Sequence, residues 1–242
     1  MKASIAKAAV ILAFLAMICV NALATILPIN GLTTGAVADF YPSYFVPAGY
    51  VFSIWGLIYL ALLVFTLVQA LSRSLQTLVT PIRWLFVLSC IANGAWILCW
   101  HYRQLALSVG VMLVLLITLI IVYLRLRTAA DNAWARWTVL APFGVYLAWI
   151  CVATIANISA LLLAMGWEGA PLSGPWWAVI MMVIAAAIIA RLAMTSRDAL
   201  PPLVLAWAIV GIVVKFPDQM VMRVVGATIV VAMLGLSAMI RR

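Results

Sequence analysis

The chain consists of long apolar runs separated by short segments that hold most of the charged residues. Eight runs cover residues 8–27, 48–70, 84–100, 105–124, 142–165, 176–194, 200–214 and 224–240. A helix needs about 20 apolar residues to cross the hydrocarbon core of a bilayer. Inside the bilayer the backbone must bond to itself, so a spanning segment is a helix or part of a closed barrel. The runs are continuous rather than alternating, which predicts an all-α, polytopic membrane helix bundle with about eight transmembrane helices.

Composition excludes a soluble domain. The chain is 69% hydrophobic and 8% charged, whereas soluble domains are about half apolar and a quarter charged. The net charge of +9 comes from residues at the ends of the runs, and they form no basic face of the kind that binds nucleic acid. The run 200–214 is short for a crossing, so we expect it to tilt little or to lie in a thinned part of the bilayer.

The first run resembles a secretory signal peptide at one point. Ala22, Leu23 and Ala24 imitate a cleavage site. The length of the run and the presence of Asn21 favour a retained membrane span, and cleavage is the alternative.

Basic residues are divided unequally between the two sides that eight crossings define. Three of them lie on one side: Arg103, Lys215 and Arg223. The other side, which holds both termini, has eleven: Lys2, Lys7, Arg73, Arg83, Arg125, Arg127, Arg136, Arg191, Arg197, Arg241 and Arg242. Cytoplasmic loops carry an excess of lysine and arginine, so we predict that both termini are cytoplasmic. The loop 28–47 and the loop that contains Glu168 then share the opposite side.

One polar and aromatic face is built into the fifth run. Pro142, Tyr146, Trp149, Ala153 and Asn157 are spaced by four, three, four and four residues, so they share one face of a helix. An amide left unbonded in hydrocarbon costs about 2–7 kcal/mol. We therefore expect this face to look inward, toward other helices or a ligand.

Two further faces have the same character. The second run carries Phe52, Trp55 and Tyr59 on one side, and the third carries Asn93, Trp96 and Trp100. Aromatic faces with a few amides are typical of pockets for flat apolar ligands. Helix packing is the alternative, because amide bonds between membrane helices contribute about 0.6 kcal/mol. We favour a pocket for the three faces together.

The loop 28–47 is long and ends in an aromatic group. This group consists of Phe40, Tyr41, Tyr44 and Phe45. Loops of this length are usually functional or disordered, and aromatic residues argue against disorder. Two interpretations remain, namely a loop lying at the membrane interface and a lid over a pocket.

Few residues predict catalysis or metal binding. The only histidine, His101, is expected to be an interfacial anchor, with axial ligation of haem as the alternative. The four cysteines lie within apolar runs without a CxxC pair, and no acidic residue lies inside a run. We therefore predict no catalytic residue, no metal site and no ion-coupled transport.

Three motifs resemble the tryptophan-rich sensory protein (TspO/MBR) family, which includes the mitochondrial translocator protein. In the first, Pro47, Val51, Phe52, Trp55 and Tyr59 match the family pattern, while Ala48 and Tyr50 replace a proline and a tryptophan. The second is Asn93 with Trp96. The third comprises Tyr146, Trp149, Ala153, Thr154 and Asn157.

The resemblance implies a five-helix core and a lidded pocket. Residues 1–165 would form the core, with 28–47 as the ligand-lidding loop, and 166–242 would add three transmembrane helices, as in a longer bacterial branch. The protein would lie in the bacterial inner membrane, with family-like homodimers. The cholesterol-recognition segment of animal members is absent after Asn157, so a sterol role loses support.

The resemblance also implies a function. Family members bind porphyrins and related tetrapyrroles, and they are linked to transport, stress signalling and light-dependent porphyrin breakdown. We expect a receptor with a porphyrin or haem-like ligand and no required cofactor. A facilitative transporter is one alternative, and a porphyrin-degrading activity that uses Trp55, Trp96 and Trp149 is another. The expected ligand-binding residues are Tyr50, Phe52, Trp55, Tyr59, Asn93, Trp96, Tyr146, Trp149, Ala153 and Asn157.

Overall fold

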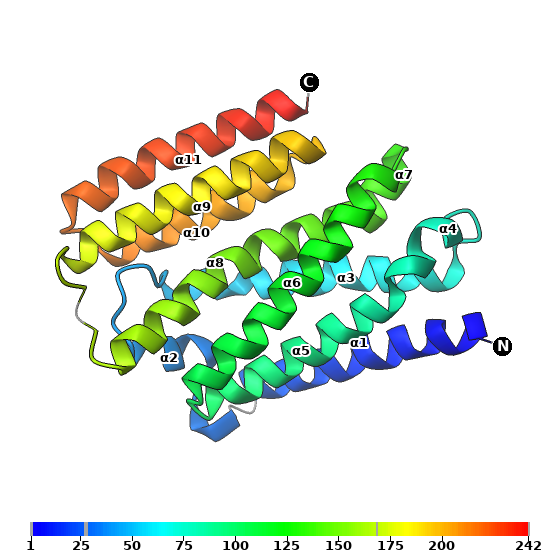
Figure 1. The fold of residues 1–242 in the computed structure, drawn as a ribbon, viewed down its shortest axis with the longest axis horizontal. Coiled ribbons are helices and arrows are strands. Elements are labelled where there is room, and N and C mark those ends of the chain that lie inside the picture. Colours follow the sequence, from blue (N-terminus) through cyan, green and yellow to red (C-terminus); the bar gives the residue numbers. More distant parts are fainter. Residues whose placement is uncertain (1, 27–28, 168, 242) are drawn as a thin grey trace. The chain divides into compact units, whose positions relative to one another are not determined.

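The computed structural model describes residues 2–26, 29–167 and 169–241, and in these ranges it contains helices but no strand. The long helices are labelled in Figure 1. They are α1 (Lys2–Ile26), α3 (Ile54–Leu71), α5 (Arg83–His101), α6 (Leu105–Ala129), α8 (Ala141–Ala164), α9 (Gly174–Ser196), α10 (Leu200–Lys215) and α11 (Met220–Ile240).

The helices confirm the all-α membrane bundle. Seven helical stretches of the described chain are long and apolar enough to cross a membrane. The eighth, α10, has 16 residues, as the short run 200–214 predicts. Its first turn holds Pro201 and Pro202. Backbone N–H groups in the first turn have no acceptor within the helix, so a proline there costs no hydrogen bond. The end of the first predicted span, Leu27, lies outside the described residues.

Two predicted loops are partly helical. The loop 28–47, whose Pro28 lies outside the described residues, contains η1 (Ile29–Gly31) and α2 (Thr34–Asp39). Helix α6 continues to Ala129, so the predicted loop residues Arg125 and Arg127 lie near its end. Basic side chains are favourable there because they face the negative end of the helix dipole.

The remaining short elements adjoin longer helices. The turn η2 (Gly49–Ser53) leads into α3, and α4 (Gln76–Val79) and η3 (Thr80–Ile82) lead into α5. Helix α7 (Ala133–Ala135) and the π-helical turn η4 (Arg136–Leu140) lead into α8.

The chain forms two compact units. Unit 1 comprises Met1–Val37 and Ile54–Leu147, and unit 2 comprises Ala38–Ser53 and Ala148–Arg242. The chain passes between them three times, the last time within α8. The division into a five-helix core and three added helices at residues 165 and 166 stays a prediction.

Unit 1 is organised around α5. Helix α5 packs against α1 and α6, and α1 also contacts α3. Phe65, Phe86 and Phe143 form a compact triangle with ring centroids 4.9, 4.9 and 5.8 Å apart. At the start of α5, the buried guanidinium of Arg83 donates to the Oε1 of Gln69 at 3.0 Å and to the hydroxyl of Thr80 at 3.0 Å. These contacts join the end of α3 to the start of α5.

Unit 2 is built on three helices that lie side by side, α9, α10 and α11 (Figure 1). Gly226 of α11 lets this helix approach Val213 and Ile209 of α10. The hydroxyl of Ser237 donates to the carbonyl of Ala199 at 2.8 Å, which joins α11 to the segment before α10. The segment 38–53, although early in the sequence, belongs to this unit.

Candidate functional site

Four aromatic rings form a continuous row in unit 1, which we call the aromatic row. In order they are Tyr59, Trp55, Trp96 and Trp100. Successive ring centroids lie 5.5, 6.1 and 6.0 Å apart, with interplanar angles of 22°, 32° and 21°. Each helix supplies two rings four residues apart, which places them on one helical face. The row therefore presents nearly parallel aromatic faces from α3 and α5.

A buried hydrogen-bond chain lies beside the aromatic row. The amide of Asn21 donates to the Oδ1 of Asn93 at 2.7 Å, and the amide of Asn93 donates to the hydroxyl of Tyr146 at 2.9 Å. The Tyr146 ring meets the ring of Trp55 edge to face, with centroids 6.0 Å apart. The side chains of Asn21, Asn93, Tyr146 and Trp55 are all buried. The chain thus joins α1, α5 and α8, and it satisfies polar groups that would be costly in hydrocarbon.

The prediction that the face of the fifth run looks inward is confirmed. Tyr146, Trp149 and Asn157 are buried, as is Pro142, and Ala153 is half-buried. For Asn93 and Tyr146 the contacts are with other helices of unit 1.

The predicted residues of unit 2 lie mainly in ring pairs. The Phe52 ring meets Trp149 edge to face at 6.0 Å, and the half-exposed Tyr50 meets Trp207 in the same way at 5.4 Å. Ala153 and Asn157 follow along α8. The ten predicted residues therefore divide equally between the units. Unit 1 holds Trp55, Tyr59, Asn93, Trp96 and Tyr146, and unit 2 holds the other five.

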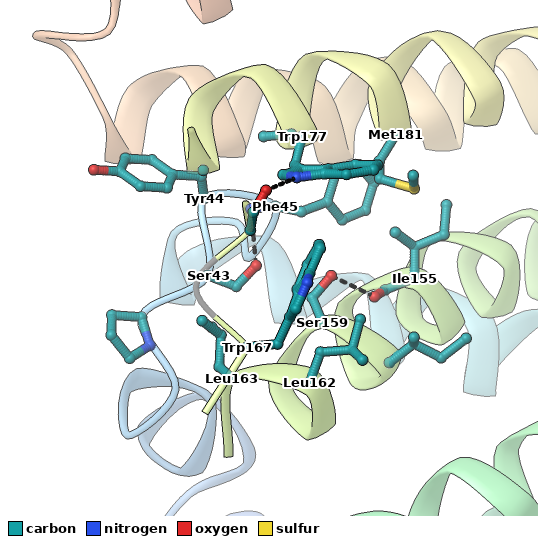
Figure 2. A pocket seen from close by; sticks show the side chains of 15 residues that line it. Ser43, Tyr44, Phe45, Ile155, Ser159, Leu162, Leu163, Trp167, Trp177 and Met181 are labelled. Atoms are coloured by element: carbon teal, nitrogen blue, oxygen red, sulfur yellow. Dashed lines mark hydrogen bonds between the residues drawn. The ribbon is translucent and has the colours of Figure 1, made fainter. Parts of the chain in front are cut away.

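Unit 2 also contains a cavity, which we call the α9 cavity (Figure 2). Its volume is about 460 Å³, within the range of about 300–1,000 Å³ that is typical of small-molecule sites. Its walls come from residues 42–45 of the first loop, five residues of α8 between positions 155 and 163, and residues of the segment 167–181.

The walls of the α9 cavity are mostly apolar. Their described residues include no lysine, arginine, histidine, aspartate or glutamate. The hydroxyl of Ser159 donates to the carbonyl of Ile155 at 2.9 Å, and the indole N–H of Trp177 donates to the carbonyl of Gly169 (Figure 2). The Trp167 and Trp177 rings lie 5.3 Å apart.

Sequence reasoning missed most of this cavity. None of the ten predicted residues lines it. Tyr44 and Phe45 do, and they belong to the aromatic end of the loop. The sequence offered one indication of the other wall. Trp167 and Trp177 lie on either side of a glycine- and proline-rich turn. Glu168, in the same turn, lies outside the described residues.

His101 is held by the first part of the loop. Its Nδ1 lies 3.0 Å from the carbonyl of Ile29, and its Nε2 lies 3.1 Å from the hydroxyl of Thr34. The side chain is buried. Both ring nitrogens are thus engaged, which favours the anchoring role over ligation of haem. No group of histidine, cysteine, aspartate or glutamate in the described chain is arranged to hold a metal ion.

The fold and these aromatic clusters define a multi-pass membrane protein made of apolar helices. A family model for TSPO-like protein matches residues 7–240, and the chain belongs to this family. The match extends through α9, α10 and α11, so the last three helices are part of the family pattern. Neither curated proteins nor solved structures gave a match.

Proposed function

We propose that this protein is a membrane receptor that binds porphyrin-like tetrapyrroles. The observation that carries the proposal is the aromatic row of unit 1, in a chain that belongs to the TSPO-like family. A tetrapyrrole is flat, aromatic and largely apolar. Each aromatic contact contributes about 0.5–1.5 kcal/mol beyond the burial of its area.

Tyr59 is the member of the row on which such a ligand would stack. It is half-buried, whereas Trp55, Trp96 and Trp100 are buried. Its ring lies nearly parallel to Trp55 at an angle of 22°, so a flat ligand on its outer face continues the row. Asn93 is already bonded within the protein, and we assign it the task of fixing the row rather than of contacting the ligand.

Ligand sensing fits this chain better than ion-coupled transport. The membrane-spanning helices of the described chain contain no aspartate or glutamate, and intramembrane acids are the usual mark of coupling to protons or sodium. Uptake of porphyrin into vesicles that contain the purified protein would instead favour facilitated transport.

The test is a titration of purified protein with protoporphyrin IX in the dark, followed by the porphyrin absorbance band and by tryptophan fluorescence. We expect saturable binding that Tyr59→Ala weakens about 2- to 10-fold, the loss of one aromatic contact. Trp84→Phe is the control, because Trp84 lies on α5 but is 60% exposed. Absence of saturable binding, or equal weakening by both variants, would contradict the proposal.

Location and assembly belong to the same proposal. The proposed location is a bacterial inner membrane, as the family resemblance implies, with both termini in the cytoplasm, which the eleven-to-three division of basic residues supports. A green fluorescent protein fused after Arg242 should then fluoresce, and alkaline phosphatase at the same position should be inactive. The homodimer implied by the resemblance is tested by cross-linking in membranes.

A further inference from the structure

The α9 cavity has a chemistry different from that needed for a tetrapyrrole dicarboxylate. Its described walls carry no cationic side chain. A carboxylate enclosed in apolar walls without a cation or several donors is strongly disfavoured. The cavity also shares no residue with the aromatic row. Tetrapyrrole binding at the aromatic row therefore does not explain the cavity.

The walls are suited to a flat, uncharged molecule. Trp167 and Trp177 present aromatic faces from either side of the turn before α9 (Figure 2). Met181, one turn farther along α9, adds a flexible thioether that adapts to the shape of a ligand. Leu162 and Leu163 supply the opposing aliphatic surface from α8.

Three side-chain hydrogen-bond donors of the wall are not used within the described chain, namely the hydroxyls of Ser43 and Tyr44 and the indole N–H of Trp167, and only Ser43 of the three is buried. The Oγ of Ser43 accepts a bond from the backbone N–H of Phe45 at 3.2 Å, but its hydroxyl hydrogen has no acceptor among the described residues. The serine itself is buried. The donors of Ser159 and Trp177 are both bonded to backbone carbonyls. Ser43 is thus the buried unused donor of the wall, and a buried donor is the one that would select a ligand bearing an acceptor atom.

The loop wall of the cavity is attached firmly to the rest of unit 2. The Tyr44 ring packs against Phe216 with centroids 4.9 Å apart. The Tyr44 ring also lies against Gly174, where an added Cβ would come within 2.5 Å of it. A wall held from two sides makes a largely pre-formed site, which reduces the ordering cost of binding.

We propose that the α9 cavity is a second binding site, which takes a neutral, flat, apolar molecule carrying one hydrogen-bond acceptor such as a carbonyl oxygen. The aromatic part stacks against Trp167 and Trp177, and the acceptor receives the hydroxyl hydrogen of Ser43. This site is independent of tetrapyrrole binding at the aromatic row.

Benzophenone is a suitable probe, because it is a neutral aromatic ketone that inserts into nearby C–H bonds on irradiation. The purified full-length protein is irradiated with increasing benzophenone, and adducts are mapped by mass spectrometry. Labelling of Met181 should saturate, and benzanilide, a neutral aromatic amide, should suppress it. The exposed Met194, Met220 and Met239 give an internal reference for unspecific labelling, which should rise linearly.

Two neighbouring substitutions separate filling of the cavity from general damage. Leu162→Trp should lower Met181 labelling about tenfold, because the larger side chain occupies the cavity. Leu161→Trp should leave it unchanged, because Leu161 is also half-buried but does not line the cavity. If Leu162→Trp does not fold, Ser43→Ala serves as the test variant. Its loss of one hydrogen bond should weaken the suppression of Met181 labelling by benzanilide about threefold.

Two results would overturn this inference. The first is labelling of Met181 that does not saturate and only matches that of the exposed methionines, which would make the cavity part of the lipid-facing surface. The second is protoporphyrin IX binding that Leu162→Trp abolishes and Tyr59→Ala leaves intact. That pattern would assign the tetrapyrrole to the cavity. If the wild type does not bind porphyrin but Met181 labelling still saturates, only the proposed function is contradicted.

Discussion

The indole N–H of Trp207 in α10 donates to the backbone carbonyl of Val51 at 3.1 Å, although the two residues are 156 positions apart. Close by, the backbone N–H of Ala48 donates to the carbonyl of Gly211 at 3.1 Å. These bonds attach the segment before α3 to a helix near the end of the chain. In unit 2, α10 thus holds in place the loop that forms one wall of the α9 cavity.

The close approach of loop and helix depends on Gly211. A Cβ at this position would collide with the side chain of Val51 and lie 3.2 Å from Pro47. We expect Gly211→Ala to reduce the free energy of unfolding by about 1–3 kcal/mol, the usual cost of overpacking. Gly235→Ala on α11 is the control, because a Cβ there meets no atom within 4 Å. Denaturation in detergent, followed by circular dichroism, measures both. Equal stability of the two variants would contradict the tight contact.

The ion pair between Lys215 and Asp39 attaches the same segment at a second point. Its atoms are 2.8 Å apart, but the Asp39 side chain is 66% exposed. Exposed pairs contribute about 0–1 kcal/mol, so Asp39→Asn should destabilise the protein much less than Gly211→Ala. Unfolding at low and high salt tests this prediction. A salt-sensitive loss as large as that of Gly211→Ala would show that charge, rather than packing, holds the loop.

Sequence patterns predicted the helices and the inward face but not the α9 cavity. The apolar runs are long and are separated by charged residues, so each helix is a local property of its run. Asn93 and Trp96 are evident as candidates because polar residues are costly in hydrocarbon. In contrast, the packing of Tyr44 on Gly174 joins segments that are distant in the sequence. No local sequence pattern at either position predicts this contact. The helical segment within loop 28–47 was missed because it is short and carries no clear periodicity.

The amide of Asn93 should be coupled energetically to the hydroxyl of Tyr146. Asn93→Ala removes the bonds to both Asn21 and Tyr146, and we expect a loss of about 1–2 kcal/mol in unfolding free energy. Tyr146→Phe removes only the second bond. The double variant should lose less than the sum of the single variants, by about 0.5–1.5 kcal/mol. Strict additivity in unfolding measurements would contradict a direct bond.

Arg83 should not be replaceable by lysine. Its guanidinium reaches the side chains of Gln69, Gln76 and Thr80 and is almost fully buried. A lysine keeps the charge but lacks the planar set of donors, so Arg83→Lys should destabilise the protein by about 1.5–3 kcal/mol. Arg73→Lys, at an exposed position between α3 and α4, should have little effect. A similar melting temperature for the two variants would argue against this bonding pattern.

The most direct test of the central claim is a protoporphyrin IX titration of three proteins under the same conditions: the wild type, Tyr59→Ala and Leu162→Trp. The two substitutions change the aromatic row and the α9 cavity separately. We predict saturable binding to the wild type, binding about 2- to 10-fold weaker to Tyr59→Ala, and unchanged binding to Leu162→Trp. Binding that is absent from the wild type, or that is insensitive to Tyr59→Ala in the folded protein, would contradict the central claim.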